Sequence, residues 1–303
     1  MTAESNVPEV LRDVESRLAP TWSPLPDKPE ETLELTARAL WFAAAGDPRS
    51  VARCREARLP ALDAAGLDRL RALVERRASG TPLAHITERQ SFLGLEMIAS
   101  PDALIPRRET ELLARTALER MQAFVGSRES AVAIDVCTGS GNVALALAAH
   151  DPRVTVFASD ISEPALKLAE VNAAHLGLVG RVHFAASDLF AGLESSGLHG
   201  KADVVTCNPP YIPAPKLGHM PSAIIGYEPR LAFDGGSFGL KVITRLFADA
   251  PRFLRPGASL CFEVGAGTGQ SLADRVRKNP AYVEVTPVTD DAGVVRVIAA
   301  TVA

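Results

Sequence analysis

The sequence predicts an α/β fold, a doubly wound and mostly parallel sheet of seven strands, with a small helical domain before it. Two observations support this fold. Apolar runs of strand length alternate with helical runs through the later part of the chain, the pattern of a parallel sheet covered by helices. Two amphipathic helical stretches precede them with no strand between, which is typical of a separate helical domain. A chain of 303 residues has room for both.

The first part of the chain contains three segments. Residues 1–28 are rich in proline, serine and acidic residues, and we expect an irregular lead-in there. Apolar residues then recur at helical spacing over 29–80, where Pro29 suits the first position of a helix. Alternation of apolar and polar residues over 81–106 predicts a short hairpin that links this helical domain to the next.

Residues 107–303 form the predicted sheet domain. A helix begins at Glu109, and further helices are predicted over 142–150, 163–175 and 240–254. Strands are predicted over 132–136, 154–159, 181–186, 202–207 and 259–264. The last two segments, 282–288 and 294–299, flank an Asp-Asp-Ala-Gly turn and predict an antiparallel hairpin at the sheet edge.

Composition and charge exclude several classes of protein. Hydrophobic residues make up 47% and charged residues 22%, as in a globular protein. A net charge of -4 argues against a protein that grips phosphate backbones, so we expect no direct nucleic-acid partner. The four cysteines are far apart and show no metal-ligand spacing, which predicts reduced thiols and no metal. The N-terminus resembles no signal peptide and no apolar run is long enough to cross a membrane, so we expect a cytoplasmic protein without a membrane partner.

A glycine-rich turn joins the first strand of the sheet domain to its helix. Asp135 precedes the turn, which consists of Cys137, Thr138, Gly139, Ser140 and Gly141. Glycines let a ligand approach the backbone, and the helix start offers free N–H groups. Asp160 ends the next strand, where a carboxylate accepts both hydroxyls of a ribose, and Asp188 follows the third. The third glycine of a dinucleotide motif is missing and Asp135 suits a cationic amino-acid group, so S-adenosylmethionine is favoured over a nicotinamide cofactor.

A second glycine-rich stretch runs from Glu263 to Gly269, also between a strand and a helix. The chain that follows is too short for the further strands that a nucleoside site requires. We therefore interpret this stretch as a tight turn without a ligand.

The tetrapeptide Asn208-Pro209-Pro210-Tyr211 directly follows the fourth strand, at the same edge of the sheet. An amide nitrogen is a poor nucleophile because its lone pair is delocalised, so acceptors must hold its N–H groups and localise charge during attack. The Asn208 side-chain oxygen and the Pro209 carbonyl supply two acceptors, and proline makes the turn rigid. Tyr211 stacks on a flat amide or base. The tetrapeptide predicts methyl transfer to nitrogen, with these four residues as the catalytic group.

A family resemblance is carried by four further stretches, residues 75–86, 92–96, 104–111 and 227–232. With the glycine turn and the Asn-Pro-Pro-Tyr tetrapeptide, the chain over residues 68–300 resembles class I methyltransferases of the HemK family. These enzymes methylate the side-chain amide of glutamine in peptide chain release factors. The resemblance implies a Rossmann-like catalytic domain, S-adenosylmethionine as cofactor, and a helical domain that helps dock a release factor, whose Gly-Gly-Gln loop delivers the glutamine.

The resemblance also implies the contacts of each ligand. Combined with the residues discussed above, it gives this full set of expected cofactor contacts: Asp135, Cys137, Thr138, Gly139, Ser140, Gly141, Asp160, Ile161, Asp188, Leu189 and Asn208. The expected substrate contacts are Asn208, Pro209, Pro210, Tyr211, Arg107 and Thr110, of which the last two belong to a segment similar to the one that closes over the family's site.

Other functions remain open from the sequence. A relative that methylates a small molecule would use the long loop 212–236 to shape its pocket. A nucleic-acid adenine or guanine methyltransferase would stack a flipped base on Tyr211, although the net acidity counts against it. A non-enzymatic module that binds release factors or ribosomes would require a decayed cofactor site, whereas this one is intact.

Overall fold

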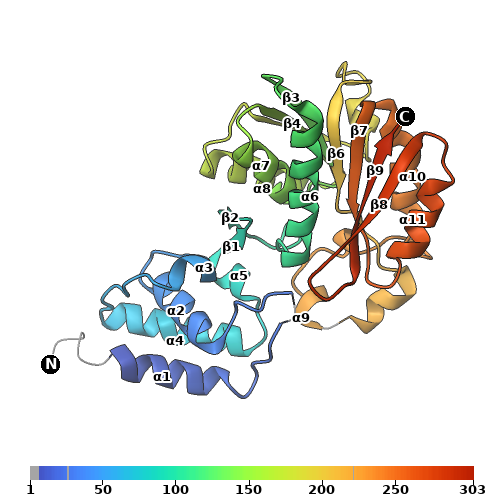
Figure 1. The fold of residues 1–303 in the computed structure, drawn as a ribbon. Helices are drawn as coiled ribbons and strands as arrows, with labels where there is room; N and C mark the ends of the chain where they lie inside the picture. The colour runs from blue at the N-terminus through green and yellow to red at the C-terminus, as the bar shows by residue number, and fades with distance from the viewer. Residues whose placement is uncertain (1–6, 26, 221) are drawn as a thin grey trace. The chain divides into compact units, whose positions relative to one another are not determined.

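The computed structural model describes residues 7–25, 27–220 and 222–303, which form two compact units (Figure 1). The first unit comprises Met1–Pro101, Ile105–Arg107 and Pro221–Tyr227, and the second Asp102–Leu104, Arg108–Met220 and Glu228–Ala303. The sequence predicts two consecutive domains, whereas a short segment near residue 225 returns to the first unit. Over the described part of the chain, none of the helices combines the length and the hydropathy needed to cross a bilayer.

The first unit is mainly helical. It contains α1 (Val7–Leu18), α2 (Leu33–Ala44), α3 (Val51–Cys54), α4 (Ala64–Ala78), α5 (Leu83–Thr87), α9 (Ser222–Ile225) and the antiparallel hairpin of β1 (Arg89–Phe92) and β2 (Leu95–Ile98). Helix α2 is at its centre, with Leu40, Trp41 and Phe42 buried among its neighbours. The hairpin predicted within 81–106 is confirmed.

Two predictions for the start of this unit are wrong. Residues 7–18 form helix α1 rather than an irregular lead-in, because Val14 and Leu18 recur on one face and are buried against the helical core. Pro29 is not the first residue of α2, since Thr32 accepts a hydrogen bond from the backbone N–H of Leu35 and caps that helix. Residues 1–6 and Pro26 of the expected lead-in lie outside the described residues.

The second unit is built on the predicted sheet. Its strands are β3 (Ala131–Val136), β4 (Val154–Asp160), β5 (Val182–Ala186), β6 (Ala202–Cys207), β7 (Leu254–Glu263), β8 (Tyr282–Thr289) and β9 (Val295–Val302). They lie in the order β5-β4-β3-β6-β7-β9-β8, and β9 runs in the direction opposite to the other six strands. The doubly wound, mostly parallel sheet of seven strands is thereby confirmed. Chain order reverses between β3 and β6, the kind of switch point beside which such sheets bind ligands.

Five helices cover this sheet, and they are α6 (Arg108–Val125), α7 (Asn142–His150), α8 (Glu163–His175), α10 (Lys241–Asp249) and α11 (Gly269–Arg277). Short 3-10 turns occur at Ala191–Leu193, Ala214–His219, Arg230–Ala232 and Ala250–Arg252. The helix predicted over 240–254 is too long. Pro251 lacks the N–H that would continue α10 beyond Asp249, and Leu254 already starts β7.

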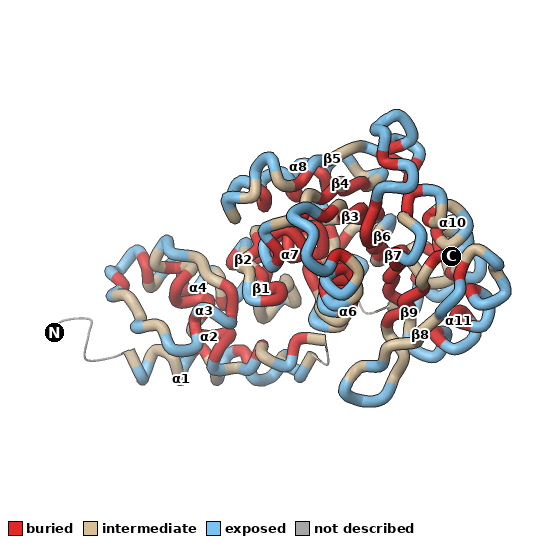
Figure 2. The backbone as a smooth tube through the Cα atoms, turned by 45° about the horizontal axis from the view of Figure 1, so that its top comes forward, coloured by how far each residue is buried: buried red, intermediate tan, exposed pale blue. Residues whose placement is uncertain are grey.

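Alternation along the strands sorts their side chains onto two faces of the sheet. The register pairs Ile134 with Val205 and Val205 with Leu260, and these side chains belong to the main core, together with apolar residues of α10 and α11. The central strands are buried along most of their length (Figure 2). Asp135 and Thr206 pair on the opposite face, where helix α6 packs over β6, β7 and β9. This α6 face carries the polar residues at the carboxyl ends of the strands.

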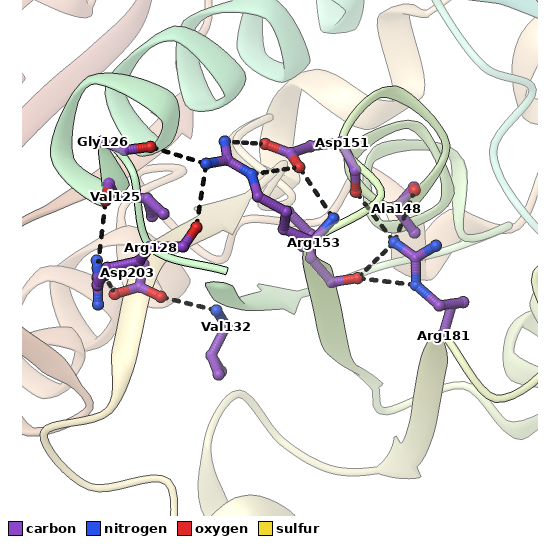
Figure 3. A network of polar contacts seen from close by, with 10 residues as sticks. Val125, Gly126, Arg128, Val132, Ala148, Asp151, Arg153, Arg181 and Asp203 are labelled. Atoms are coloured by element: carbon purple, nitrogen blue, oxygen red, sulfur yellow. Dashed lines mark hydrogen bonds and ion pairs between the residues drawn. The ribbon is translucent and has the colours of Figure 1, made fainter. Parts of the chain in front are cut away.

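Arginine and aspartate side chains tie the other ends of the strands together (Figure 3). The buried Asp203 of β6 accepts from the Arg128 guanidinium at 2.8 Å and from the Val132 backbone N–H of β3 at 2.7 Å. Arg153, just before β4, donates to Asp151 and to the carbonyl of Gly126. These contacts fix the starts of β3, β4 and β6. The strands therefore give the loops at their carboxyl ends a rigid base.

Candidate active site

The predicted glycine turn links β3 to α7 in a backbone shape that its sequence explains. Cys137, Gly139 and Gly141 all have positive φ, of 58°, 55° and 83°. A Cβ at Gly141 would lie 3.1 Å from the Cβ of Ala169 in α8, so close packing of α7 requires a glycine there. At Gly139 no atom lies within 4 Å of the Cβ position. The turn therefore packs on one side and leaves the other side open for a ligand to approach.

Asp135 supports this turn from beneath. Its carboxylate is 1% exposed and accepts hydrogen bonds from the hydroxyls of Thr138 and Thr206, each at 2.6 Å. Burial raises the pKa of Asp135 to about 6, while the two hydroxyls act in the opposite direction. Since both oxygens are engaged, the side chain shapes the turn.

The ends of β4 and β5 supply the acids predicted beside the turn. Asp160 accepts from the backbone N–H of Gly139 at 2.8 Å and from that of Ser162 at 2.9 Å, and burial raises its pKa. Ile161 next to it is 58% exposed, an unusual position for a large aliphatic side chain. Asp188 points its carboxylate at Arg245, with both oxygens 3.0 Å from one guanidinium nitrogen.

Leu189 has a positive φ of 55°, and its carbonyl accepts from the hydroxyls of Ser159 and Ser187. This backbone geometry holds the β5 loop close to the end of β4. Within the glycine turn, the Ser140 hydroxyl oxygen is buried without a hydrogen-bond partner among the described residues. An open glycine, a buried carboxylate and an orphaned hydroxyl together fit a polar ligand with a ribose beside the turn.

The Asn-Pro-Pro-Tyr turn follows the fully buried end of β6. The Asn208 side-chain NH₂ donates to the Thr110 hydroxyl of α6 at 3.2 Å, so its oxygen points to the other side of the amide, free to accept. The Tyr211 hydroxyl donates to Glu263 Oε1 of β7 at 3.3 Å, and burial raises the pKa of this tyrosine, which keeps it neutral. Pro209 between them is buried.

The segment around Gly235 fixes this turn from behind. The Ile212 N–H donates to the carbonyl of Phe233, and the Gly235 N–H donates back to that of Ile212. A Cβ at Gly235 would lie 2.7 Å from the carbonyl oxygen of Pro210, and one at Gly239 would overlap that of Tyr211. Only glycine lets the two backbones approach this closely.

The structure brings Thr110 together with Asn208, in the same unit as Tyr211 and Glu263. Arg107 belongs to the other unit, where its guanidinium donates to Asp27 at 2.8 Å. The two predicted substrate contacts on this segment thus fall in different units.

Sequence reasoning missed Glu263 and Gly265. The stretch from Glu263 to Gly269 does form a turn between β7 and α11, as expected, but its first residues contact Tyr211. Strand alternation offered a signal, because Glu263 lies an even number of residues from Cys261, which pairs with Thr206 on the α6 face.

Comparisons with known proteins show the family of this chain. The family model of the methyltransferase small domain matches residues 110–220. The release factor glutamine methyltransferase of Moorella thermoacetica is 41% identical over 253 residues, which cover 84% of this chain and 85% of that relative. The chain belongs to the release factor glutamine methyltransferases. A member from Bradyrhizobium diazoefficiens is 33% identical over 270 residues, 89% of this chain and 88% of its own length.

Membership of this family confirms the HemK resemblance and makes the chain a methyltransferase. Solved structures agree on the fold. The hMettl16 catalytic domain in complex with a MAT2A 3′UTR hairpin superposes with a TM-score of 0.56 at 16% identity, over 76% of this chain and 80% of that one. The human methyltransferase 10 domain containing protein gives 0.50 at 17% identity, over 68% and 88%. At such identities the likeness concerns the fold alone.

Proposed function

We propose that this family member transfers a methyl group from S-adenosylmethionine to the side-chain amide nitrogen of the glutamine in the Gly-Gly-Gln motif of a peptide chain release factor. The observation that carries the proposal is the orientation of Asn208. Its NH₂ is bound to Thr110 and its oxygen is left to accept beside Tyr211. The names of the relatives support the substrate.

The residues around the glycine turn hold the cofactor in this proposal. Gly139 leaves its backbone open, Asp160 accepts the ribose hydroxyls, and Ile161 and Leu189 cover the flat face of the base. The bound cofactor supplies a methyl group made electrophilic by a sulfonium. Ser140 offers its unpartnered hydroxyl to the polar end of the cofactor.

The Asn-Pro-Pro-Tyr turn holds and orients the side-chain amide of the substrate glutamine. The two N–H groups of this glutamine amide donate to the Asn208 side-chain oxygen and to the Pro209 carbonyl. These bonds raise the electron density on the glutamine nitrogen as the new bond forms. Pro209 and Pro210 keep this turn from adjusting, since proline fixes φ. The Tyr211 ring stacks on the amide plane and excludes water from that side. The nitrogen–carbon bond forms as the methyl–sulfur bond breaks, and one of the two N–H protons then leaves the nitrogen for solvent, because amide oxygens are too weakly basic to keep it. Orientation and electrostatics therefore account for the step without a covalent intermediate.

The substrate and its location complete the proposal. The helical first unit docks the body of the release factor, and the reaction takes place in the cytoplasm. The experiment is incubation with methyl-labelled S-adenosylmethionine and a bacterial release factor, beside the same factor with the glutamine of its motif replaced by glutamate. We expect label in the first factor and none in the second. Equal labelling of both, or label only in a metabolite extract or in nucleic acid, would refute the assignment.

A further inference from the structure

The turn between β7 and α11 supports the Tyr211 side chain at two points. Glu263 Oε1 accepts from the Tyr211 hydroxyl at 3.3 Å. The ring lies against Gly265, where a Cβ would be 3.1 Å from Tyr211 Cδ2 and 3.4 Å from Cε2. One contact fixes the end of the side chain and the other fixes its face, so the ring has little freedom to tilt.

Thr110 of α6 acts on both sides of this cluster. Its hydroxyl accepts from the Asn208 NH₂ at 3.2 Å, and its side chain lowers the pKa of Glu263. The direct hydrogen bond to Glu263 comes from Tyr211, so the carboxyl group acts on the Asn-Pro-Pro-Tyr turn through the tyrosine.

We propose that Glu263 is a positioning residue of the reaction, an acceptor that fixes the Tyr211 side chain through its hydroxyl. This inference rests on the proposed function, in which the oxygen of Asn208 and the ring of Tyr211 hold the amide. Glu263 itself touches neither substrate nor cofactor. It sets the direction of every hydrogen bond that ends on it, because an ionised carboxylate only accepts.

A purely structural role does not explain this carboxyl group. Glu263 is 2% exposed, and its second oxygen, Oε2, has no hydrogen-bond partner among the described residues. An orphaned buried oxygen destabilises the folded state, and such costs gather at functional sites. The charged groups that act on it are Glu109 of α6, which raises its pKa, and Arg296 of β9, which lowers it; burial dominates and brings the value to about 7. Glu263 thus changes charge near neutral pH.

The first test is Glu263→Gln, which removes the charge and gives one side of the group a donor. We expect kcat on the release factor to fall about tenfold or more, because misaligned reacting groups lose rate steeply. The Kd for S-adenosylhomocysteine should stay unchanged, since the glycine turn is untouched. The matched control is Glu284→Gln, which removes an equal charge from an exposed position on β8 in the same sheet. Equal kcat values for the two variants would overturn the proposal.

The pH profile separates positioning from packing. Wild-type kcat should decline as the pH falls through about 7, where Glu263 becomes protonated and able to donate. Glu263→Gln should lose that limb of the profile. Tyr211→Phe, which keeps the ring and removes the hydroxyl, should lower kcat in the wild-type background but much less in the Glu263→Gln background, because both changes break the same hydrogen bond. Effects that simply multiply would contradict positioning through this hydrogen bond.

A crystal structure of Glu263→Gln gives a readout that needs no substrate. We expect the Tyr211 ring to move relative to the wild-type enzyme. An unmoved ring would overturn the positioning role even if the release factor proved to be the wrong substrate. Conversely, a wild-type enzyme that labels no release factor, with the Tyr211 ring displaced in the variant, would refute only the proposed function.

Discussion

Replacing Gly235 by alanine tests how tightly the Asn-Pro-Pro-Tyr turn must be held. The added Cβ would lie 2.7 Å from both the Pro210 carbonyl oxygen and the Gly239 Cα, whereas ordinary contacts begin at 3.4 Å. The two backbone segments must therefore separate by roughly 0.7 Å, the difference of these values. Because a displacement of about 1 Å at a reacting centre costs on the order of 100-fold in rate, we expect kcat to fall at least about tenfold. Steady-state kinetics with the release factor measure this loss.

Gly218→Ala is the matched control for this variant. Gly218 lies in the same unit, its φ is also outside the left-handed region, and no atom lies within 4 Å of its Cβ position. We expect it to retain wild-type kcat. Cofactor affinity should be unchanged in both variants, and overpacking should cost Gly235→Ala about 1–3 kcal/mol of stability. If the kcat values of the two variants differed by less than a factor of about two, the close contact at Gly235 would not position the Asn-Pro-Pro-Tyr turn.

Three further predictions concern single side chains. Asn208→Ala should abolish transfer while leaving the Kd for S-adenosylhomocysteine within a small factor by calorimetry, and retained activity would refute its role as acceptor. Asp160→Asn should weaken cofactor binding about tenfold, since a charge-assisted bond to the ribose is lost; an unchanged Kd would remove Asp160 from the site. Burial raises the pKa of Asp135 from an ordinary 3.8 to about 6, so the folded state keeps a proton that the unfolded chain releases. The free energy of unfolding should therefore decline by ~3 kcal/mol as pH rises through that window, and urea titrations of Asp135→Asn should lack this decline.

Strand and helix positions in the second unit follow closely from the sequence, because burial on both sides of a parallel sheet leaves clear apolar runs. The helices over 142–150 and 163–175 match α7 and α8 residue for residue. Two errors have different causes. Pro251 ends α10 early. The proline, serine and acidic residues of 1–28 suggest an irregular segment and obscure the helical spacing of Val14 and Leu18, which pack α1 on other helices.

The residues of the candidate site also fall into those that the sequence predicts and those that it does not. The glycine turn, Asp160 and Asn208 lie at neighbouring strand ends, so the topology of a parallel sheet predicts that they meet. The support from Glu263 was hidden because β7 is far from β6 in sequence and next to it in the sheet. Arg107 and Thr110 are three residues apart, yet the boundary between the two units falls between them. Contacts across long sequence separations are the part that strand patterns alone do not specify.

A crystal structure with S-adenosylhomocysteine and a Gly-Gly-Gln peptide is the most direct measurement of how the amide is held. We expect the glutamine nitrogen within hydrogen-bond distance of the Asn208 side-chain oxygen and the Pro209 carbonyl, its plane against Tyr211 and its free side facing the cofactor sulfur. A glutamine held by other groups, or a cofactor bound away from the Gly139 turn, would contradict the mechanism.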